Sequence, residues 1–514
     1  MDVPLLCAPP FPGIDAAVSS PGVGEGDVLT SDAIDRLFAA IREARVGGAF
    51  WAPPAVERAE VIDRTDAALA PPGEVDPWSL LDPRVGLIAD GDDPWLALAI
   101  IVGCPVQIRS SGRFGAVGAD LETLRRGVAA DLTRVRYRDP FTGEGASVDA
   151  TIALLGDWRR IFEANRKIVA GCGFSWWKRR EIARFLWTPA HALRFFRSER
   201  AALRYAERQG GALAIWPSRV STGLIAQAST RGVPLVRVED GFVRSVGLGS
   251  NLVPPSSIAV DRLGIHYDPA NASDLETLLS TTEFAADLLA RAARLRKTIV
   301  EAGISKYGHD AAQPMPPRSD RRLVLVAGQV EDDMSVRLGG GGLASNLELL
   351  RRARALEPEA ELWFRPHPDV DAGHRKGVVR DADAMLYADR IVRGGGMAPL
   401  LGVVDAVHIL TSLTGFEALL REREVTCHGI PFYAGWGLTR DLAPVPDRRG
   451  RVLSLDALVA GVLIAYPRYL DPMTGLPCAP EMLIRRMKGG AAHNRLGWLT
   501  RLKQVQGRLM KRRA

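Results

Sequence analysis

Residues 234–241 read Pro-Leu-Val-Arg-Val-Glu-Asp-Gly, an apolar run that ends in two carboxylates and a glycine. Short apolar runs of this kind recur along the chain, with helix-like segments between them, a pattern typical of parallel sheets. We therefore predict an α/β protein built from doubly wound, Rossmann-like domains. The strand candidates are residues 212–216, 234–238, 323–327, 360–364 and 406–410.

Several of these runs continue directly into polar or glycine-containing turns, at residues 239–241, 328–333, 365–369 and 411–415. Ligands of open parallel sheets lie at such carboxyl ends. The proline-rich stretch 313–317 separates the two groups of strands and is typical of a linker. We expect two domains that hold the substrates in a cleft between them.

The composition is that of a folded globular protein, with 47% hydrophobic and 25% charged residues. Its 514 residues are too many for one hydrophobic core, so we expect roughly two to four domains. The five cysteines have no CxxC spacing, which favours reduced thiols over disulfides or a zinc site. No run reaches the length of a bilayer span, and residues 1–26 do not resemble a signal peptide. We expect a cytoplasmic protein that binds no nucleic acid, since no nucleic-acid-binding motif is present.

An eight-residue motif occurs twice, as RYRDPFTG at 136–143 and RYLDPMTG at 468–475, with six identical positions. A helix-like segment and a short apolar strand lie upstream of each copy, so we infer a duplicated unit whose first copy is truncated. The predicted division is a non-catalytic module remnant at 1–165, an N-terminal acceptor-side Rossmann-like domain at 166–312, a C-terminal nucleotide-sugar domain at 313–487 and a basic tail at 488–514. The tail could rest on an anionic membrane or be solvated.

Two turns favour phosphate binding. Ser412, Thr414 and the first free amides of the following helix can face a phosphate, although ordinary helix capping explains the same residues. His367 stands between prolines and could bind or protonate a phosphate, or be structural. Arg365 could add charge to this site or form a surface ion pair.

Carboxylates occupy two further turns. Glu239 and Asp240 could serve as nucleophile and acid/base, with different roles because neighbours on an extended strand point apart, or could form a solvated acidic turn. The acidic loop 331–333 suggests magnesium only weakly. The P-loop pattern is missing, which disfavours a P-loop phosphotransferase. We expect no metal and no cofactor.

These turns, in this order, resemble the bacterial capsule-polysaccharide β-Kdo transferases of the KpsC/LipA type. The resemblance implies a GT-B fold and CMP-β-Kdo as the donor substrate. It further implies transfer of Kdo, with retention, to a β-Kdo linker on a phospholipid in capsule biosynthesis. The Glu-Asp-Gly and His-Pro pairs are also similar to motifs of bacterial sialyltransferases. The matching segments are Gly173-Phe174 with residues 177–179, then 237–249, 253–257, 261–268, 304–307, 328–333, 365–370, 411–420, 429–437 and 466–477.

Carried onto this sequence, the resemblance implies Asp240 as nucleophile, Glu239 as supporting carboxylate or acid/base, and His367 with Ser412 and Thr414 at the CMP phosphate. Arg244, Lys306 and Gln329 are candidates for the sugar carboxylate and hydroxyls. Arg365, Pro368, Gly415 and Glu417 complete the expected substrate-binding set.

The first copy of the repeat lacks counterparts of the Glu-Asp-Gly and Pro-His-Pro motifs, so we expect a single catalytic centre. The expected partners are the CMP-sugar donor, the lipid-linked Kdo acceptor and capsule assembly or export machinery, at the inner face of the cytoplasmic membrane. Two alternatives stay open: a non-catalytic export or scaffold component, and a transferase that uses CMP-sialic acid.

Overall fold

The computed structural model describes residues 3–22, 26–57, 60–65, 75–244, 253–306, 308–309 and 319–489. The predicted linker at 313–317, the matching residues 245–249 and 307, and the basic tail from residue 490 lie outside the described residues. The chain forms two compact units. The smaller comprises residues 1–169, 186–194 and 474–476, and the larger comprises 170–185, 195–473 and 477–514.

The smaller unit packs four helices around one apolar core: α1 (Ser31–Ala44), α2 (Pro94–Val102), α3 (Leu121–Arg134) and α4 (Val148–Asn165). Helix α2 is apolar on all sides, and residues 95–101 are all buried, so it is the centre of this core. A parallel sheet has the order β2-β3-β4 (Val61–Asp63, Gly86–Ala89, Val106–Ile108). A small antiparallel sheet joins β1 (Ser19–Ser20), β5 (Arg136–Arg138) and β6 (Gly145–Ala146).

The first sheet of the larger unit has the order β21-β20-β11-β10-β9-β7-β8. Strands β9 and β10 are parallel, but β10-β11, β11-β20 and β20-β21 are antiparallel. The prediction of a purely doubly wound domain is therefore wrong here, because β11 returns beside β10 in the opposite direction. The strands are β7 (Ile168–Cys172), β8 (Arg194–Phe196), β9 (Ala212–Ile215), β10 (Leu235–Asp240), β11 (Ser257–Asp261), β20 (Pro467–Leu470) and β21 (Pro477–Cys478), with helices α5 (Arg179–Phe185), α6 (Glu199–Arg208), α7 (Thr222–Thr230), α8 (Asp274–Thr281) and α9 (Ala286–Glu301).

The second sheet of the larger unit is parallel throughout, with the order β16-β15-β14-β17-β18-β19. Numbered along the chain this is 3-2-1-4-5-6, the strand order of dinucleotide-binding Rossmann domains, with its switch point between β14 and β17. The strands are β14 (Leu323–Ala327), β15 (Glu361–Arg365), β16 (Arg390–Ile391), β17 (Ala406–Ile409), β18 (Glu424–Cys427) and β19 (Arg440–Asp441). All three strands predicted in this region are confirmed to within a residue.

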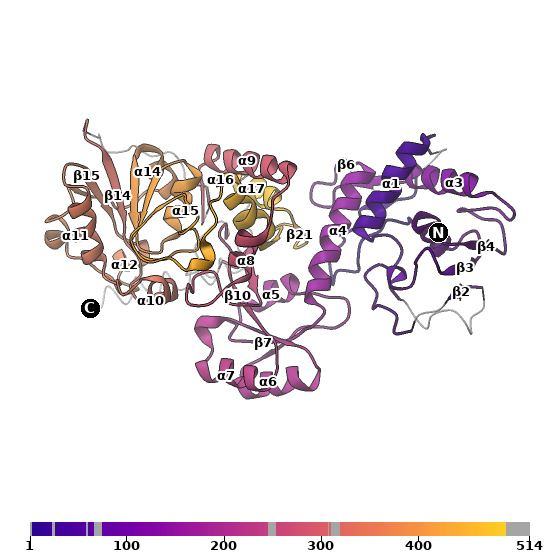
Figure 1. The fold of residues 1–514 in the computed structure, drawn as a ribbon, viewed down its shortest axis with the longest axis horizontal. Coiled ribbons are helices and arrows are strands. Elements are labelled where there is room, and N and C mark those ends of the chain that lie inside the picture. Colours follow the sequence, from indigo (N-terminus) through magenta and orange to yellow (C-terminus); the bar gives the residue numbers. More distant parts are fainter. Residues whose placement is uncertain are drawn as a thin grey trace, which may run out of the picture. The chain divides into compact units, whose positions relative to one another are not determined.

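Helices cover both faces of this parallel sheet (Figure 1). Val324 and Val326 of β14 pack with the residues of α11 (Asn346–Leu356), whereas Leu323 and Leu325 join a core with α14 (Met397–Val403), α15 (Leu413–Leu420) and α16 (Leu455–Val459). The second core also contains Phe242 and Ala259 of the first sheet region, so the two sheets of this unit share one interior. The remaining helices are α10 (Met334–Gly339), α12 (Pro368–Asp371), α13 (Asp381–Ala384) and α17 (Pro480–Lys488).

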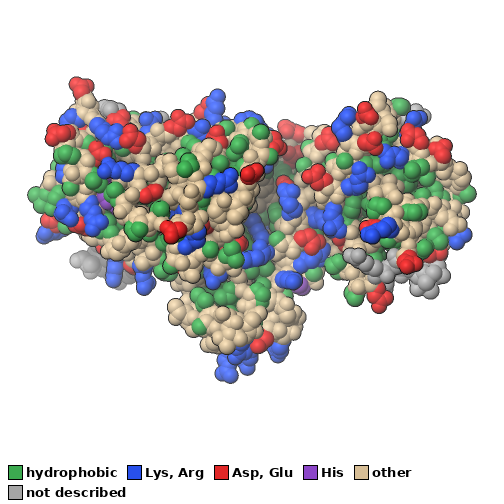
Figure 2. All heavy atoms as spheres, in the orientation of Figure 1, with side chains coloured by type: hydrophobic (Ala, Val, Ile, Leu, Met, Phe, Trp, Pro, Cys, Tyr) green, Lys and Arg blue, Asp and Glu red, His purple; other side chains and the backbone are tan. Residues whose placement is uncertain are grey.

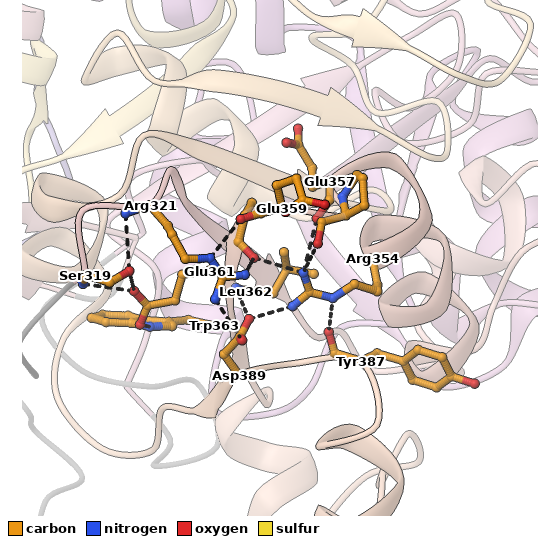
Figure 3. Close-up of polar contacts among 12 residues, drawn as sticks. Ser319, Arg321, Arg354, Glu357, Glu359, Glu361, Leu362, Trp363, Tyr387 and Asp389 are labelled. Atoms are coloured by element: carbon orange, nitrogen blue, oxygen red, sulfur yellow. Dashed lines mark hydrogen bonds and ion pairs between the residues drawn. The ribbon is translucent and has the colours of Figure 1, made fainter.

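Polar side chains close the amino-terminal edge of the parallel sheet (Figure 3). Arg354 donates to the carbonyls of Tyr387 and Ala360, both at 2.9 Å, and Asp389 accepts from the Leu362 amide at 2.8 Å. A hollow of about 450 Å³ beside them is lined by Arg321, Arg322 and residues 357–360. Both arginines already have carboxylate partners. Their ion pairs stabilise this edge of the sheet, and neither charge is left for a ligand in the hollow.

The repeated motif has the same local structure in both places. Tyr137 donates to the Leu132 carbonyl at 2.8 Å, and Tyr469 donates to the Leu463 carbonyl at 2.7 Å, so each tyrosine ties its strand to the preceding helical segment. The closing glycines, Gly143 and Gly475, both have a φ of 76°, which favours glycine over any residue with a Cβ. The sequence repeat is thus a structural repeat.

Within the described residues, no helix is long and apolar enough to cross a membrane.

Gly415 on α15 should tolerate no side chain. A Cβ there would lie 2.3 Å from the hydroxyl of the buried Tyr433, which donates to the Ser412 carbonyl. We expect Gly415→Ala to lower the free energy of unfolding by about 1–3 kcal/mol through overpacking. Gly402→Ala on α14 is the control, because its Cβ would meet nothing within 4 Å. Denaturant unfolding that shows equal stability for the two variants would contradict this packing.

Candidate functional site

Glu239 and Asp240 are the last two residues of β10, not the turn that follows it. They pair with Ala259 and Ile258 of β11, which extends the strand beyond its predicted end. Gly241 must then be a glycine, because a Cβ would come within 2.1 Å of the Ser257 hydroxyl. Its amide donates to the Ser257 carbonyl at 3.0 Å. The strand pairing and this close approach fix the backbone positions of Glu239 and Asp240.

Asp240 is held between two cations. Lys178 Nζ donates to Asp240 Oδ1 at 2.9 Å, and Arg244 Nε donates to Asp240 Oδ2 at 2.8 Å. The Arg244 side chain is 1% exposed and also donates to the Val253 carbonyl at 2.9 Å. Lys178 is buried against aromatic faces, with Nζ 3.6 Å from the centre of the Trp216 ring. One carboxylate therefore has a fixed position and two positive neighbours.

The same environment gives the two carboxyl groups different protonation states. Burial raises the pKa of Asp240, but Lys178 and Arg244 outweigh it and hold this pKa below its usual value. Burial and the negative charge of Asp240 raise the pKa of Glu239 to about 8. At neutral pH Asp240 is ionised while Glu239 carries a proton. Adjacent groups with separated pKa values are characteristic of catalytic pairs.

Lys306 connects this pair to the second sheet. Its amide donates to Glu417 Oε1 of α15 at 2.8 Å, and its carbonyl accepts from the Arg244 amide at 3.0 Å. After the larger effect of burial, the charge of Lys306 contributes to the pKa values of both Glu239 and His367. Glu239 and His367 thus lie within electrostatic reach of one side chain.

The switch point of the parallel sheet is closed by a pair of hydrogen bonds. The Gln329 side chain donates to Thr411 Oγ1 at 3.0 Å and accepts from the Thr411 amide at 2.7 Å. The Gln329 amide also donates to Asn346 Oδ1 at 2.8 Å. Gln329 is buried and holds the loops after β14 and β17 together, at the edge where Rossmann domains bind nucleotides.

The phosphate-binding candidates cap helices. His367 precedes α12, where Pro368 is the first residue, and its Nδ1 accepts from the Asp369 amide at 3.2 Å. This bond requires a neutral ring with its proton on Nε2, and burial lowers the pKa of His367 accordingly. Ser412 caps α15 by accepting from the Thr414 amide at 3.2 Å, and its hydroxyl donates to Thr414 Oγ1 at 3.0 Å. Ordinary helix capping, the alternative interpretation of these residues, is therefore confirmed. It places the hydroxyls of Ser412 and Thr414 at the N-terminus of α15.

Arg365 is not a surface residue. It is buried and donates to the carbonyls of Val392, Gly394 and Gly395, so the alternative prediction for this residue is wrong. Its guanidinium group holds the loop after β16 through these hydrogen bonds.

The acidic loop 331–333 likewise has structural roles. Glu331 accepts from the Asn346 amide at 2.8 Å, Asp332 pairs with Arg375 at 3.1 Å, and Asp333 caps α10. Among the described residues, no group of three or more His, Cys, Asp or Glu could hold a metal ion.

Lys178 is the site residue that sequence reasoning missed. It lies 62 positions before Asp240, so no local pattern links the two. The Trp177-Lys178-Arg179 segment was the available signal, because a lysine next to a tryptophan can be held by cation–π contact.

Comparison with known proteins matches the model of the family described as "Capsule polysaccharide biosynthesis protein" to residues 211–316 and 293–469. The capsule polysaccharide modification protein LipA of Neisseria meningitidis serogroup A is 39% identical over 389 residues, which are 73% of this chain and 55% of LipA. The lipopolysaccharide-processing protein LpsZ of Rhizobium meliloti is 49% identical over 242 residues, 46% of this chain and 54% of LpsZ. The chain spans about half the length of these curated relatives.

Two solved structures of KpsC from Thermosulfurimonas dismutans are also similar. The chain titled β-Kdo 2,7 transferase has a TM-score of 0.52 and 33% identity, and the match covers 63% of this chain and 99% of that one. The β-Kdo 2,4 transferase has a TM-score of 0.55 and 31% identity, with 63% and 98% covered.

Glu239→Gln should remove a pH-dependent loss of stability. Because the folded-state pKa of Glu239 is about 8, against about 4.5 for an exposed glutamate, wild type loses stability as pH rises from about 4.5 through 8. Gln imitates the protonated acid and does not titrate. We expect the melting temperature of the variant to rise relative to wild type between pH 6 and pH 9. A difference that is constant over this interval would contradict a Glu239 that is protonated in the folded protein.

Proposed function

Since the chain belongs to the capsule polysaccharide biosynthesis protein family, we propose that it is a GT-B glycosyltransferase that transfers Kdo from CMP-β-Kdo, with retention of configuration, to a β-Kdo-terminated glycolipid. The observation that carries this proposal is the ionised Asp240 between Lys178 and Arg244, next to a protonated Glu239. Retaining transfer through a covalent intermediate needs one ionised and one protonated carboxyl group.

Asp240 acts as the nucleophile in this proposal. Its carboxylate oxygen attacks the anomeric carbon of the donor, the bond from that carbon to the CMP phosphate breaks, and the electron pair leaves with the phosphate oxygen. Glu239 is the available acid for that oxygen. Once Asp240 is an ester it is neutral, so one cause of the raised Glu239 pKa disappears. Glu239 can then take the proton of the acceptor hydroxyl as the acceptor displaces Asp240.

The parallel sheet supplies the nucleotide site. The N-terminus of α15, with Ser412 and Thr414, faces the carboxyl edge of the sheet and suits the CMP phosphate. A neutral His367 can donate from Nε2 to the same phosphate without adding charge. Gln329 sets the spacing of the two loops, and Pro368, Gly415, Glu417 and Arg365 hold their helices and turns in place.

The smaller unit is proposed to be non-catalytic. Its loop after β3 contains Asp90, Asp92 and Asp93, and the last two directly precede α2 where Thr411 and Ser412 directly precede α15 in the larger unit. Asp93 caps α2 as Ser412 caps α15. Three carboxylates at this position repel a phosphate, which favours a single catalytic centre.

The proposed acceptor is lipid-linked, so the enzyme would work at the inner face of the cytoplasmic membrane. Figure 2 shows Lys and Arg side chains gathered over the region of α6 and α7. Arg200, Arg204 and Arg208 are exposed at four-residue spacing on α6, whose opposite face buries Leu203. A row of cations of this kind suits anionic lipid headgroups, each contributing about 1 kcal/mol near the surface.

Transfer is tested with CMP-Kdo and a synthetic β-Kdo-terminated acceptor. We expect product with wild type and a rate several orders of magnitude lower with Asp240→Asn, because removal of a nucleophile abolishes the covalent route. Asp287→Asn on the exposed start of α9 should retain the wild-type rate. No product with wild type, or product only with CMP-sialic acid, would contradict the proposed donor.

Membrane binding is tested with full-length protein and vesicles containing phosphatidylglycerol. Replacing Arg200, Arg204 and Arg208 by Gln should weaken binding clearly more than replacing Arg351, Arg352 and Arg380, which are also exposed but paired with acids. The binding difference should shrink as salt rises. Equal effects of the two triple variants would argue against α6 as the membrane-facing surface.

A further inference from the structure

Lys178 loses the negative charge of its ion-pair partner during the proposed reaction. It is buried, and its ammonium group pairs with Asp240 at 2.9 Å while lying 3.6 Å from the Trp216 ring centre. Formation of the glycosyl ester removes the negative charge of Asp240, because one carboxylate oxygen becomes bonded to the anomeric carbon. A buried cation without a counterion is strongly unfavourable. In the intermediate Glu239 has given up its proton and is the remaining anion near Lys178. Lys178 Nζ has nevertheless lost the carboxylate to which it donates, so an anion that takes the place of Asp240 in this hydrogen bond stabilises the intermediate.

Arg244 loses the same negative charge but keeps a second hydrogen-bond anchor. Its guanidinium has 1% exposure and is also anchored by the Val253 carbonyl at 2.9 Å, so part of its hydrogen bonding survives the loss of the Asp240 charge. Lys178 has a compact ammonium with three donors on a flexible stem. The flat Trp216 and Trp177 faces, at 3.6 and 5.3 Å, attract the charge without fixing its direction. Lys178 is the cation that can turn towards a new partner.

We propose that Lys178 forms a carboxylate subsite: it passes from Asp240 to a carboxylate on the anomeric carbon of the transferred sugar as the ester forms. This inference rests on the proposed function and assigns its donor class to one residue. In a sugar of this kind the carboxylate and the new Asp240 ester bond share the same carbon, so the replacement anion arrives beside the one that is lost.

The exchange also explains a preference for this sugar class. The atoms balance in each half-reaction. In the first, the phosphate leaves with the electron pair of its bond to the anomeric carbon. In the second, the acceptor oxygen attacks that carbon, and the electron pair of the ester bond returns to the Asp240 carboxylate. In between, the sugar carboxylate is the counterion of Lys178. A donor without this carboxylate leaves the ammonium without a hydrogen-bonded counterion in the intermediate, so its transfer is slow even where the nucleotide binds normally.

The first test is a double comparison of enzyme and donor. Wild type and Lys178→Met are assayed with CMP-Kdo and with an analogue whose carboxylate is a primary amide. With CMP-Kdo we expect Lys178→Met to lower kcat roughly 100- to 1,000-fold, the usual effect of removing one preorganised charged contact. Wild type should reject the amide strongly, and the variant should discriminate much less, because both changes remove the same ion pair.

Rescue by a small cation separates charge from structure. Lys178→Ala lacks a propylammonium-sized group, so added propylammonium should restore part of kcat, whereas 1-propanol should not. Lys178→Arg keeps the cation and should retain discrimination against the amide donor. Lys297→Ala is the matched control on an exposed lysine, with a side chain that is 76% exposed, and should be unaffected. CMP binding and melting temperature verify that each variant is folded.

The outcomes distinguish this inference from the proposed function. If wild type transfers no sugar from CMP-Kdo, the proposed function itself fails. If wild type transfers Kdo but Lys178→Met discriminates against the amide donor as strongly as wild type, the carboxylate subsite is wrong and the proposed function stands. Rescue of Lys178→Ala by propanol as well as by propylammonium would reduce Lys178 to a packing role and also overturn the inference.

Discussion

The ion pairs of Asp240 with Lys178 and Arg244 set the chemistry of this protein. They keep one carboxylate charged in a half-buried position, with its side chain 21% exposed, where burial alone would favour the neutral acid. The charge they preserve then raises the pKa of the neighbouring Glu239. A single arrangement of two cations thus produces an ionised and a protonated carboxyl group on consecutive residues of one strand.

The fold supplies this arrangement from distant parts of the sequence. Lys178 precedes α5, Asp240 ends β10, and Arg244 is tied through its amide to Lys306, whose own amide bonds Glu417 on α15. Phe242, two residues after Asp240, packs on Phe432 with ring centres 4.5 Å apart. The shared core and this backbone link connect the carboxylate strand to the switch point of the parallel sheet, where the Gln329 side chain donates to Thr411.

Much of this was predictable where local pattern decides structure. Strand β14 was predicted to the residue, and the turns after β14, β15 and β17 were located because apolar runs pass directly into polar residues. The strand predicted at 234–238 continues to Asp240, since acidic residues rarely continue a strand and only pairing with β11 extends it. The antiparallel return of β11, the carbonyl contacts of Arg365 and the partnership of Lys178 with Asp240 all depend on tertiary contacts. The predicted roles of the substrate-binding residues stay predictions, although most of those residues lie at or beside the edge where they were expected.

The most direct test of the account is to look for the glycosyl ester itself. Wild-type protein is mixed with CMP-Kdo in the absence of acceptor, quenched in acid within milliseconds to seconds, digested with pepsin and analysed by mass spectrometry. The account predicts one added Kdo residue on the peptide that spans residues 239–241, located on Asp240 and lost when acceptor is added. Transfer to acceptor with no adduct at any quench time, or an adduct on Glu239 instead, would contradict Asp240 as the nucleophile.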